Sequence, residues 1–209
     1  MGGTGSAGSR IAREALERGH GLTIASRSGR PGEFGGHERV ETVRLDSADV
    51  DAVASRAEGH DVVVGATRPA AGMEGDIIDL THGLATGIRH AGSRLLVVGG
   101  AAPLRLPGSG RRVLDDPHWV SSEFRAVAIA SNRQLEVLSE YTDVTWTYLA
   151  PAAHFAPGSR TGRYTLAEAE LVIAPDGASV ISMEDYALAL VDLAERPTDL
   201  HKVLAVGPG

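Results

Sequence analysis

The sequence predicts an α/β fold in which helices cover both faces of a mostly parallel, doubly wound sheet. Short runs rich in β-branched residues alternate with longer segments of helical periodicity, which is the pattern of βαβ units. Two of the runs, 62–64 and 95–98, are apolar at every position, as expected of strands buried on both faces. A chain of 209 residues is long enough to bury its own core. We therefore expect one domain over residues 1–209.

The expected elements alternate along the chain. Apolar and β-branched content predicts strands at 22–26, 40–45, 61–66, 94–98, 145–149 and 202–206. Helical periodicity predicts helices at about 6–18, 48–57, 75–90, 122–141 and 182–196.

The helix ends have recognisable signals. Gly19, Gly59 and Gly92 follow the first three helical segments within two residues, where a residue without Cβ can adopt the left-handed conformation that ends a helix. Ser182 opens the last helix, and Asp185 follows three residues later. This spacing predicts a capping box.

Two segments depart from the alternation. Residues 103–119 are rich in Pro, Gly and Arg and are expected to form a loop over the carboxyl edge of the sheet. The Pro-Asp-Gly turn at 175–177 separates the apolar runs 171–173 and 180–181. It predicts a small β-hairpin on the substrate side of the domain, within residues 155–183.

Composition narrows the class of partner. The net charge of −7, from 27 acidic and 20 basic side chains, disfavours binding to a phosphate backbone, so no nucleic-acid partner is expected. No apolar stretch is long enough to span a membrane, and the start lacks the layout of a signal peptide. We expect a cytoplasmic protein with no membrane partner, either a monomer or a homodimer.

Some chemistries are excluded by the residues present. The chain has no cysteine, which rules out disulfides, thiolate catalysis and cysteine-ligated metals. Its eight histidines form no His-x-x-x-His or His-Glu-x-x-His pattern, so no metal site is expected.

The strongest local motif is the turn before the first helix. Gly2, Gly5 and Gly8 have the spacing G-x-x-G-x-x-G. Without Cβ, such a turn brings backbone N–H groups close to a pyrophosphate at the helix N-terminus, and the hydroxyls of Thr4 and Ser6 can add contacts. A glycine-rich start can also be a flexible tail, but the helix, glycine stop and strand that follow favour a dinucleotide-binding turn.

The end of the strand at 22–26 bears on which dinucleotide binds. Ser26, Arg27, Ser28 and Arg30 occupy the place where an acidic residue would favour NAD. Guanidinium and hydroxyl groups suit a 2′-phosphate, which predicts NADP(H) as the preferred cofactor and NAD(H) as the other candidate. A solvated pair of arginines on a surface loop is the alternative.

Later strands also end in candidate cofactor residues. Asp46 and Ser47 could contact the adenine amino group, and Asp46 could equally cap the next helix. Small residues follow the strands at 61–66 and 94–98, including Ala66, Thr67, Gly99 and Gly100. They leave room for a ligand, although helix packing would select small residues too.

Four segments carry a family resemblance: GGTGSAGSR at 2–10, VVGGA at 97–101, PGSRTG at 157–162 and ISMEDYA at 181–187. With these motifs, the chain resembles, over essentially its whole length, the NADH-flavin reductase-like family. That family lies in the NAD(P)H-binding, NmrA-like and biliverdin-reductase-B-like branch of the atypical short-chain dehydrogenases.

The resemblance implies a Rossmann-type domain with an NADPH site and a flavin or another flat aromatic acceptor above the nicotinamide. His154 and Phe155 would flank the acceptor. The residues that would line the cofactor are Gly2, Thr4, Gly5, Gly8, Arg27, Asp46, Ala66, Thr67, Gly99 and Pro151.

The sequence departs from the family at three places. The family has a strand of about five apolar residues before its glycine turn, whereas this sequence opens on the turn, so we expect the natural chain to start further upstream. The Tyr-x-x-x-Lys pair is absent, and Phe124 stands where a catalytic tyrosine would be. Where the family commonly has two adjacent aromatic residues, this sequence has His154-Phe155.

The missing tyrosine bears on the reaction. Reducing a ketone needs a positioned acid, and none is evident, so no catalytic residue is assigned. His154 could donate a proton, although an exposed or packing histidine is the commoner case. Hydride transfer to a flavin is less demanding. We therefore expect an oxidoreductase that passes hydride from NADPH to a flavin-like acceptor. The alternatives are a non-catalytic NADP(H)-binding redox sensor and a fragment that binds nothing.

Overall fold

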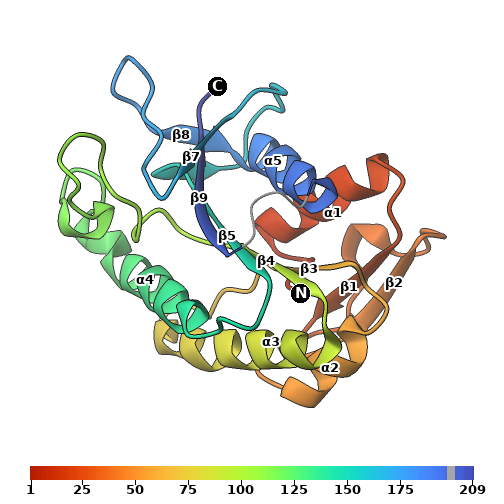
Figure 1. Cartoon of the computed structure of the whole chain (residues 1–209). Helices are drawn as coiled ribbons and strands as arrows, with labels where there is room; N and C mark the ends of the chain where they lie inside the picture. The colour runs from red at the N-terminus through yellow and green to blue at the C-terminus, as the bar shows by residue number, and fades with distance from the viewer. Residues whose placement is uncertain (197–200) are drawn as a thin grey trace.

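The α/β architecture is confirmed by the computed structural model, which describes residues 1–196 and 201–209 (Figure 1). The strands, in chain order, are β1 (Leu22–Ser26), β2 (Val40–Arg44), β3 (Val62–Gly65), β4 (Arg94–Val98), β5 (Trp146–Pro151), β6 (His154–Ala156), β7 (Thr165–Glu168), β8 (Val180–Ser182) and β9 (Lys202–Gly207). All six expected strands are present, with bounds within two residues of the prediction.

The helices are α1 (Ser6–Glu17), α2 (Val50–Ala57), α3 (Ile77–Ala91), α4 (Arg125–Ser139) and α5 (Met183–Glu195). Short 3₁₀ turns at Glu74–Asp76 and Ser122–Phe124 precede α3 and α4, so these two helices begin later than expected. Gly19, Gly59 and Gly92 have φ values of 93°, 76° and 72°, which confirms the left-handed helix ends. Pro197, expected to follow the last helix, lies outside the described residues.

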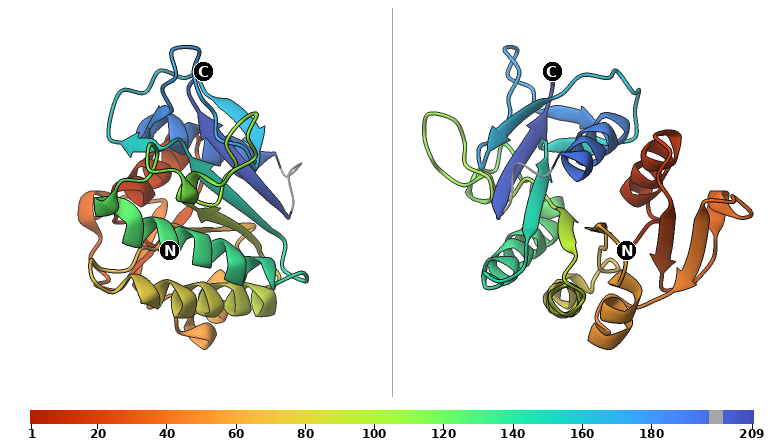
Figure 2. Two further views of the ribbon diagram at one scale, coloured as in Figure 1. Left: turned by 90° about the vertical axis from the view of Figure 1, so that its left-hand side faces the viewer. Right: turned by 45° about the vertical axis from the view of Figure 1, so that its right-hand side comes forward.

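The main sheet has five strands in the order β3-β4-β5-β9-β7. Its first four strands are parallel, and β7 pairs with β9 in the antiparallel direction. Helices α2, α3 and α4 cover one face, and α1 and α5 pack together on the other (Figure 2). The alternation predicted from hydrophobic periodicity therefore folds into the expected doubly wound layers.

The sheet is split at the position where the expected first strand would lie. β1 and β2 pair in parallel with each other but form a separate two-stranded sheet. In the right-hand view of Figure 2, β1 and β3 lie apart, each in its own sheet. No strand of the described residues joins them.

The expected hairpin between 171–173 and 180–181 is wrong. The turn exists, because Ala174 donates a backbone hydrogen bond to Ala178 and Gly177 has a φ of 88°. However, residues 171–173 form no strand. Instead, β8 pairs in parallel with β6, Phe155 opposite Ile181. The Pro-Asp-Gly turn could be read from neighbouring residues. The strand partner of Ile181 could not, because Phe155 lies 26 residues upstream in sequence.

The predicted capping box is half right. The Ser182 hydroxyl accepts a hydrogen bond from the Asp185 amide at 3.0 Å, so Ser182 is the N-cap of α5. The Asp185 carboxylate does not return to Ser182. It accepts the backbone N–H groups of Thr161 and Gly162 at 2.8 and 2.9 Å, and the Thr161 hydroxyl at 2.7 Å. Asp185 therefore anchors a distant loop.

The expected loop at 103–119 is largely confirmed. It contains a 3₁₀ turn at Val113–Asp115 and two isolated bridges, from Arg105 to Arg112 and from Arg105 to Glu170. Leu104, Leu106 and Val113 are buried in the main core, so the loop packs firmly on the domain.

Candidate functional site

The glycine turn sits between the carboxyl ends of β1 and β3. The Gly2 amide donates to the Ala25 carbonyl at 2.9 Å, and the Ala66 amide donates to the Met1 carbonyl at 3.0 Å. The turn therefore bridges the two sheets at the edge where α1 begins. In doubly wound folds, ligands bind at this edge.

The three glycines of the turn differ in how much space surrounds them. Gly2 has a φ of 74°, and a Cβ on it would lie 2.4 Å from the Ala66 carbonyl oxygen. A Cβ on Gly8 would lie 2.2 Å from the Gly2 carbonyl oxygen. Both glycines are required by the packing of the turn itself. A Cβ on Gly5 would meet only an ordinary contact of 3.4 Å, so the turn is open on the outside at Gly5.

The first turn of α1 has no side-chain cap. Its N-cap is Gly5, and the turn contains no acidic residue. By contrast, α2 is capped by the Asp49 carboxylate, which accepts from the Ala52 amide at 3.0 Å. The N–H groups and the positive end of the α1 dipole are thus left for another acceptor, and a phosphate suits them. Thr4 and Ser6 are exposed on either side of Gly5.

Two cationic side chains follow β1. Hydrogen bonds order the turn: the Ser26 hydroxyl accepts from the Gly29 amide at 3.2 Å, and the Ser28 hydroxyl accepts from the Arg30 amide at 3.3 Å. Arg27 and Arg30 are exposed. Among the residues that the structure describes, neither guanidinium forms a hydrogen bond or ion pair. Both are available to an anionic group, as a 2′-phosphate would require.

The proposed helix-cap role of Asp46 is wrong. Asp49, three residues later, is the N-cap of α2, and the Asp46 carboxylate accepts the Ala48 amide at 3.1 Å in the turn before it. The Asp46 side chain is exposed, whereas Ser47 is buried. Asp46 thus remains accessible at the end of β2.

Packing explains the glycines that end β3 and β4. A Cβ on Gly65 would lie 2.5 Å from Leu84, and one on Gly99 would lie 2.2 Å from the Tyr148 ring. A Cβ on Gly100 would lie 2.8 Å from Ser131. These three positions would exclude a side chain even without a ligand. Ala66 and Thr67 are half-buried at the same edge.

Tyr148 supports the turn after β4, a contact that sequence reasoning missed. Its phenolic oxygen accepts from the Gly100 amide at 2.9 Å, and its hydroxyl donates to the Ser131 carbonyl at 3.2 Å. Burial raises the pKa of Tyr148 well above its ordinary value. The signal available in the sequence was only a tyrosine within an apolar strand.

No tyrosine replaces the missing catalytic acid. Tyr186 is also fully buried, donates to the Leu149 carbonyl at 2.8 Å, and has its pKa raised by burial. The other two hydroxyls are bonded within the described chain as well, Tyr164 to Asp192 and Tyr141 to His82 and Thr86. Phe124 is 61% exposed just before α4.

His154 and Phe155 point to opposite faces of β6, as successive strand residues do. His154 is exposed and lines an open cavity of about 390 Å³ beside β6, β8 and the end of β9, with Ala156 and Asp185 also in its lining. Phe155 packs against Tyr186, with ring centroids 4.8 Å apart. The two side chains therefore do not line one surface, and Pro151 is buried at the end of β5.

The described residues contain neither a metal-binding cluster of side chains nor a helix able to span a membrane. Within residues 1–196 and 201–209, no group of three or more His, Asp or Glu side chains is arranged to hold a metal ion. In the same residues, no helix has both the length and the apolar character that a membrane span needs.

The chain matches the family described as NAD(P)H-binding over residues 2–197. A "putative exported protein" from Burkholderia pseudomallei is 34% identical, with a TM-score of 0.85, covering 99% of this chain and 96% of that one. A "putative epimerase" from Bacteroides thetaiotaomicron is 30% identical, with a TM-score of 0.89 and coverages of 99% and 94%. A "putative NADH-flavin reductase" from Streptococcus pneumoniae is 27% identical, with a TM-score of 0.86 and coverages of 98% and 95%.

Proposed function

Since the chain belongs to the NAD(P)H-binding family, we propose that it is an oxidoreductase that transfers hydride from NADPH to a flavin or another flat aromatic acceptor. One observation carries the proposal. The first turn of α1, uncapped by any side chain, opens at Gly5 on the carboxyl edge of the sheet. This is the place and the chemistry that a dinucleotide pyrophosphate needs.

The glycine turn binds the pyrophosphate. Backbone N–H groups at the start of α1 donate to its oxygens, and the Thr4 and Ser6 hydroxyls add contacts from the turn. The remaining cofactor contacts come from the loops after β2, β3 and β4 and from the last residue of β5: Asp46, Ser47, Ala66, Thr67, Gly99, Gly100 and Pro151.

Arg27 provides the preference for NADPH over NADH. Its exposed guanidinium, together with Arg30, lies in the turn after β1, and neither is neutralised by an acidic neighbour in the described chain. A guanidinium–phosphate contact is charge-assisted and directional, so removing it costs affinity only when the 2′-phosphate is present.

The acceptor binds beyond β5, where His154 lines the open cavity. NADPH, when bound, would supply a hydride, which carries two electrons and one proton to an oxidised flavin and would leave NADP⁺. The chain's part is to hold the acceptor ring against the nicotinamide and to exclude water. His154 can donate a hydrogen bond to the acceptor, and Phe155 supports β6 from behind through its contact with Tyr186.

Steady-state oxidation of NADPH with FMN, riboflavin or a quinone tests the proposal. Turnover that saturates with acceptor is the expected result, and calorimetry should show tighter binding of NADPH than of NADH. Tight NADPH binding without turnover on any acceptor would replace the enzyme with a non-catalytic NADP(H)-binding redox sensor. No binding of either dinucleotide to folded protein would overturn both.

A further inference from the structure

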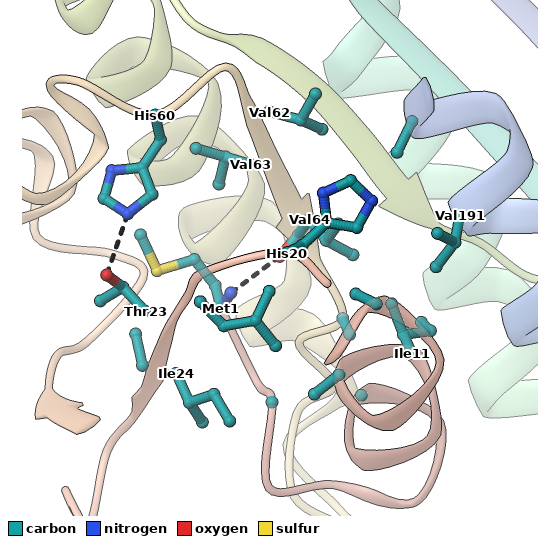
Figure 3. Close-up of a pocket in the computed structure, with 18 of the residues that line it drawn as sticks. Met1, Ile11, His20, Thr23, Ile24, His60, Val62, Val63, Val64 and Val191 are labelled. Carbon is teal, nitrogen blue, oxygen red and sulfur yellow. Dashed lines mark hydrogen bonds between the residues drawn. The ribbon is translucent and has the colours of Figure 1, made fainter. Parts of the chain in front are cut away.

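Helices α1 and α5 pack side by side on one face of the main sheet. Much of their contact is apolar, and Ile11 and Val191 from it also line a cavity of about 550 Å³ between β1 and β3 (Figure 3). Ion pairs join the two helices at their ends. The pair at the beginning of both helices, between Arg10 and Glu184, is the one that lies next to the glycine turn.

The two carboxylate oxygens of Glu184 have different partners. Oε1 accepts from the Arg10 guanidinium at 2.5 Å, and Oε2 accepts from the Gly158 amide at 2.7 Å. Burial raises the pKa of Glu184, but the hydrogen bonds from Arg10 and Gly158 outweigh this effect and hold the pKa below its ordinary value. Glu184 is therefore ionised at neutral pH and holds both donors at once.

On the cofactor side, Arg10 extends the connection to the glycine turn. A second guanidinium nitrogen of Arg10 donates to the Ser6 carbonyl at 2.8 Å. Ser6 is the first residue of α1, directly after the N-cap Gly5. Arg10 therefore contacts the residue at which the proposed pyrophosphate-binding turn passes into the helix.

On the acceptor side, Gly158 belongs to the loop at residues 157–162. This loop contributes Gly158 and its neighbours to the lining of the cavity that His154 also lines. The loop fits closely against the beginning of α5, because a Cβ on Gly158 would lie 3.0 Å from the Ser182 Cβ. A movement of Gly158 would therefore move one wall of the cavity in which the acceptor is proposed to bind.

The far end of the same loop is fixed separately. The Asp185 carboxylate accepts the backbone N–H groups of residues 161–162, and Arg160 pairs with Glu14 further along α1 at 2.9 Å. These contacts can keep the loop folded in the absence of Glu184. The near end, by contrast, is held by the bond from its backbone to Glu184.

We propose that Glu184 is a positioning residue for hydride transfer, which fixes the acceptor-side loop at Gly158 relative to the cofactor-binding turn beside Arg10. The inference rests on the proposed function, because it needs a dinucleotide at the turn and an acceptor in the cavity. Hydride transfer requires two rings at near-contact distance, and a displacement of about 1 Å can slow a reaction about 100-fold. A carboxylate shared by the two sides sets that spacing without touching either ring.

The test compares Glu184→Ala with Glu195→Gln. Glu195 also joins α5 to α1, through Arg18 at 2.8 Å, but at the opposite ends of the two helices. Single-turnover oxidation of bound NADPH by saturating FMN, or by a quinone that the parent accepts, measures the transfer step. We expect Glu184→Ala to slow this step at least about tenfold and to raise the KM for the acceptor. Its NADPH affinity, measured by calorimetry, should stay within about threefold of the parent's.

The control Glu195→Gln should transfer hydride at the parent rate. Equal slowing by Glu184→Ala and Glu195→Gln would overturn the proposal, because any loss of an ion pair between α1 and α5 would then have the same effect.

Exchanging the two charges separates positioning from helix packing. The double variant Arg10→Glu with Glu184→Arg restores an ion pair between α1 and α5 but places a side chain without an acceptor atom opposite the Gly158 amide. We expect its melting temperature to lie within about 2 °C of the parent's, while hydride transfer stays as slow as in Glu184→Ala. Recovery of the rate together with the melting temperature would reduce Glu184 to a structural ion pair and overturn the proposal.

Amide hydrogen exchange locates the change without any acceptor. In Glu184→Ala, the Gly158 amide should exchange at least about tenfold faster, whereas Thr161 and Gly162, still bonded to Asp185, should keep their rates. Faster exchange along the whole loop would mean that the substitution unfolds the loop, and would count against a positioning role.

The parent protein separates this inference from the proposed function. If the parent oxidises NADPH with none of the acceptors, the proposed function fails and the inference fails with it. If the parent turns over and Glu184→Ala does so at the same rate and KM, the inference alone is overturned.

Discussion

The phenolic oxygen of Tyr148 accepts a hydrogen bond from the Gly100 amide at 2.9 Å. The bond ties the buried centre of β5 to the turn after β4, at the edge where the proposed cofactor lies. Tyr148→Phe leaves this amide without its partner, which should cost about 1–3 kcal/mol of unfolding free energy. It should also weaken NADPH binding several-fold, because the turn loses its support. Denaturant unfolding and calorimetry measure the two effects.

Tyr141→Phe is the matched control. The Tyr141 hydroxyl bonds to His82 and Thr86 at 2.8 and 2.9 Å, beyond the carboxy-terminal end of α4 and away from the turn. It should lower stability to a similar extent and leave NADPH affinity unchanged. If both variants bind NADPH as the parent does, the Tyr148 contact is purely structural.

Arg27→Ala should separate the two dinucleotides. Loss of a charge-assisted hydrogen bond to phosphate costs about 1.5–3 kcal/mol, or roughly 10- to 100-fold in affinity. We expect this loss for NADPH and little change for NADH, both measured by calorimetry. Arg133→Ala, an exposed arginine on α4, is the charge-matched control. Equal weakening of NADPH and NADH by Arg27→Ala would rule out the phosphate contact.

Glu14 is the centre of an ion-pair network that joins α1 to α5 and to the loop at Arg160. Its carboxylate, only 7% exposed, contacts Arg18 at 2.9 Å and Arg160 at 2.9 Å, and Arg18 also contacts Asp192 at 2.6 Å. Glu14→Gln should therefore cost about 1–3 kcal/mol, because Arg160 loses its carboxylate partner and Arg18 keeps only Asp192 and Glu195. Glu17→Gln on the exposed side of α1 should cost almost nothing in the same urea unfolding assay.

The same network should weaken in acid. The hydrogen bond from Arg160 holds the pKa of Glu14 below its ordinary value, against the opposing effect of burial. A carboxyl whose pKa is lower in the folded state contributes stability at neutral pH, and that contribution is lost as pH falls through the ordinary carboxyl range and below it. Parent and Glu14→Gln should thus differ most near neutral pH and converge in acid. A difference that is constant with pH would contradict this role.

The Met1 ammonium should make stability rise between pH 6 and 8. Its pKa is about 6 in the folded protein against an ordinary 8.0, so the unfolded chain binds the proton more tightly and is favoured as pH falls. Two pKa units correspond to about 2–3 kcal/mol. Urea unfolding should be followed on protein whose mass shows that Met1 is retained. Protein acetylated at the Met1 nitrogen keeps His20 and His60 but lacks this ammonium, and should lose the rise.

The sequence by itself determined the elements of this protein. Strand and helix periodicity, the glycine stops and the Ser182 cap depend on backbone sterics and on contacts within a few residues, so they could be recognised along the chain. The glycine turn was recognised in the same way, from the spacing of Gly2, Gly5 and Gly8.

The tertiary structure alone decided which distant groups meet. Asp185 bonds to the loop at Thr161 instead of capping its own helix, β8 pairs with β6 instead of forming a hairpin, and Phe155 turns away from His154. The hydrogen bond between Tyr148 and Gly100 and the ion pairs of Glu14 could not be predicted from the sequence either. Each of these contacts joins segments that lie apart in the chain, and its partner is set by how the packed layers fill space, which no local pattern encodes.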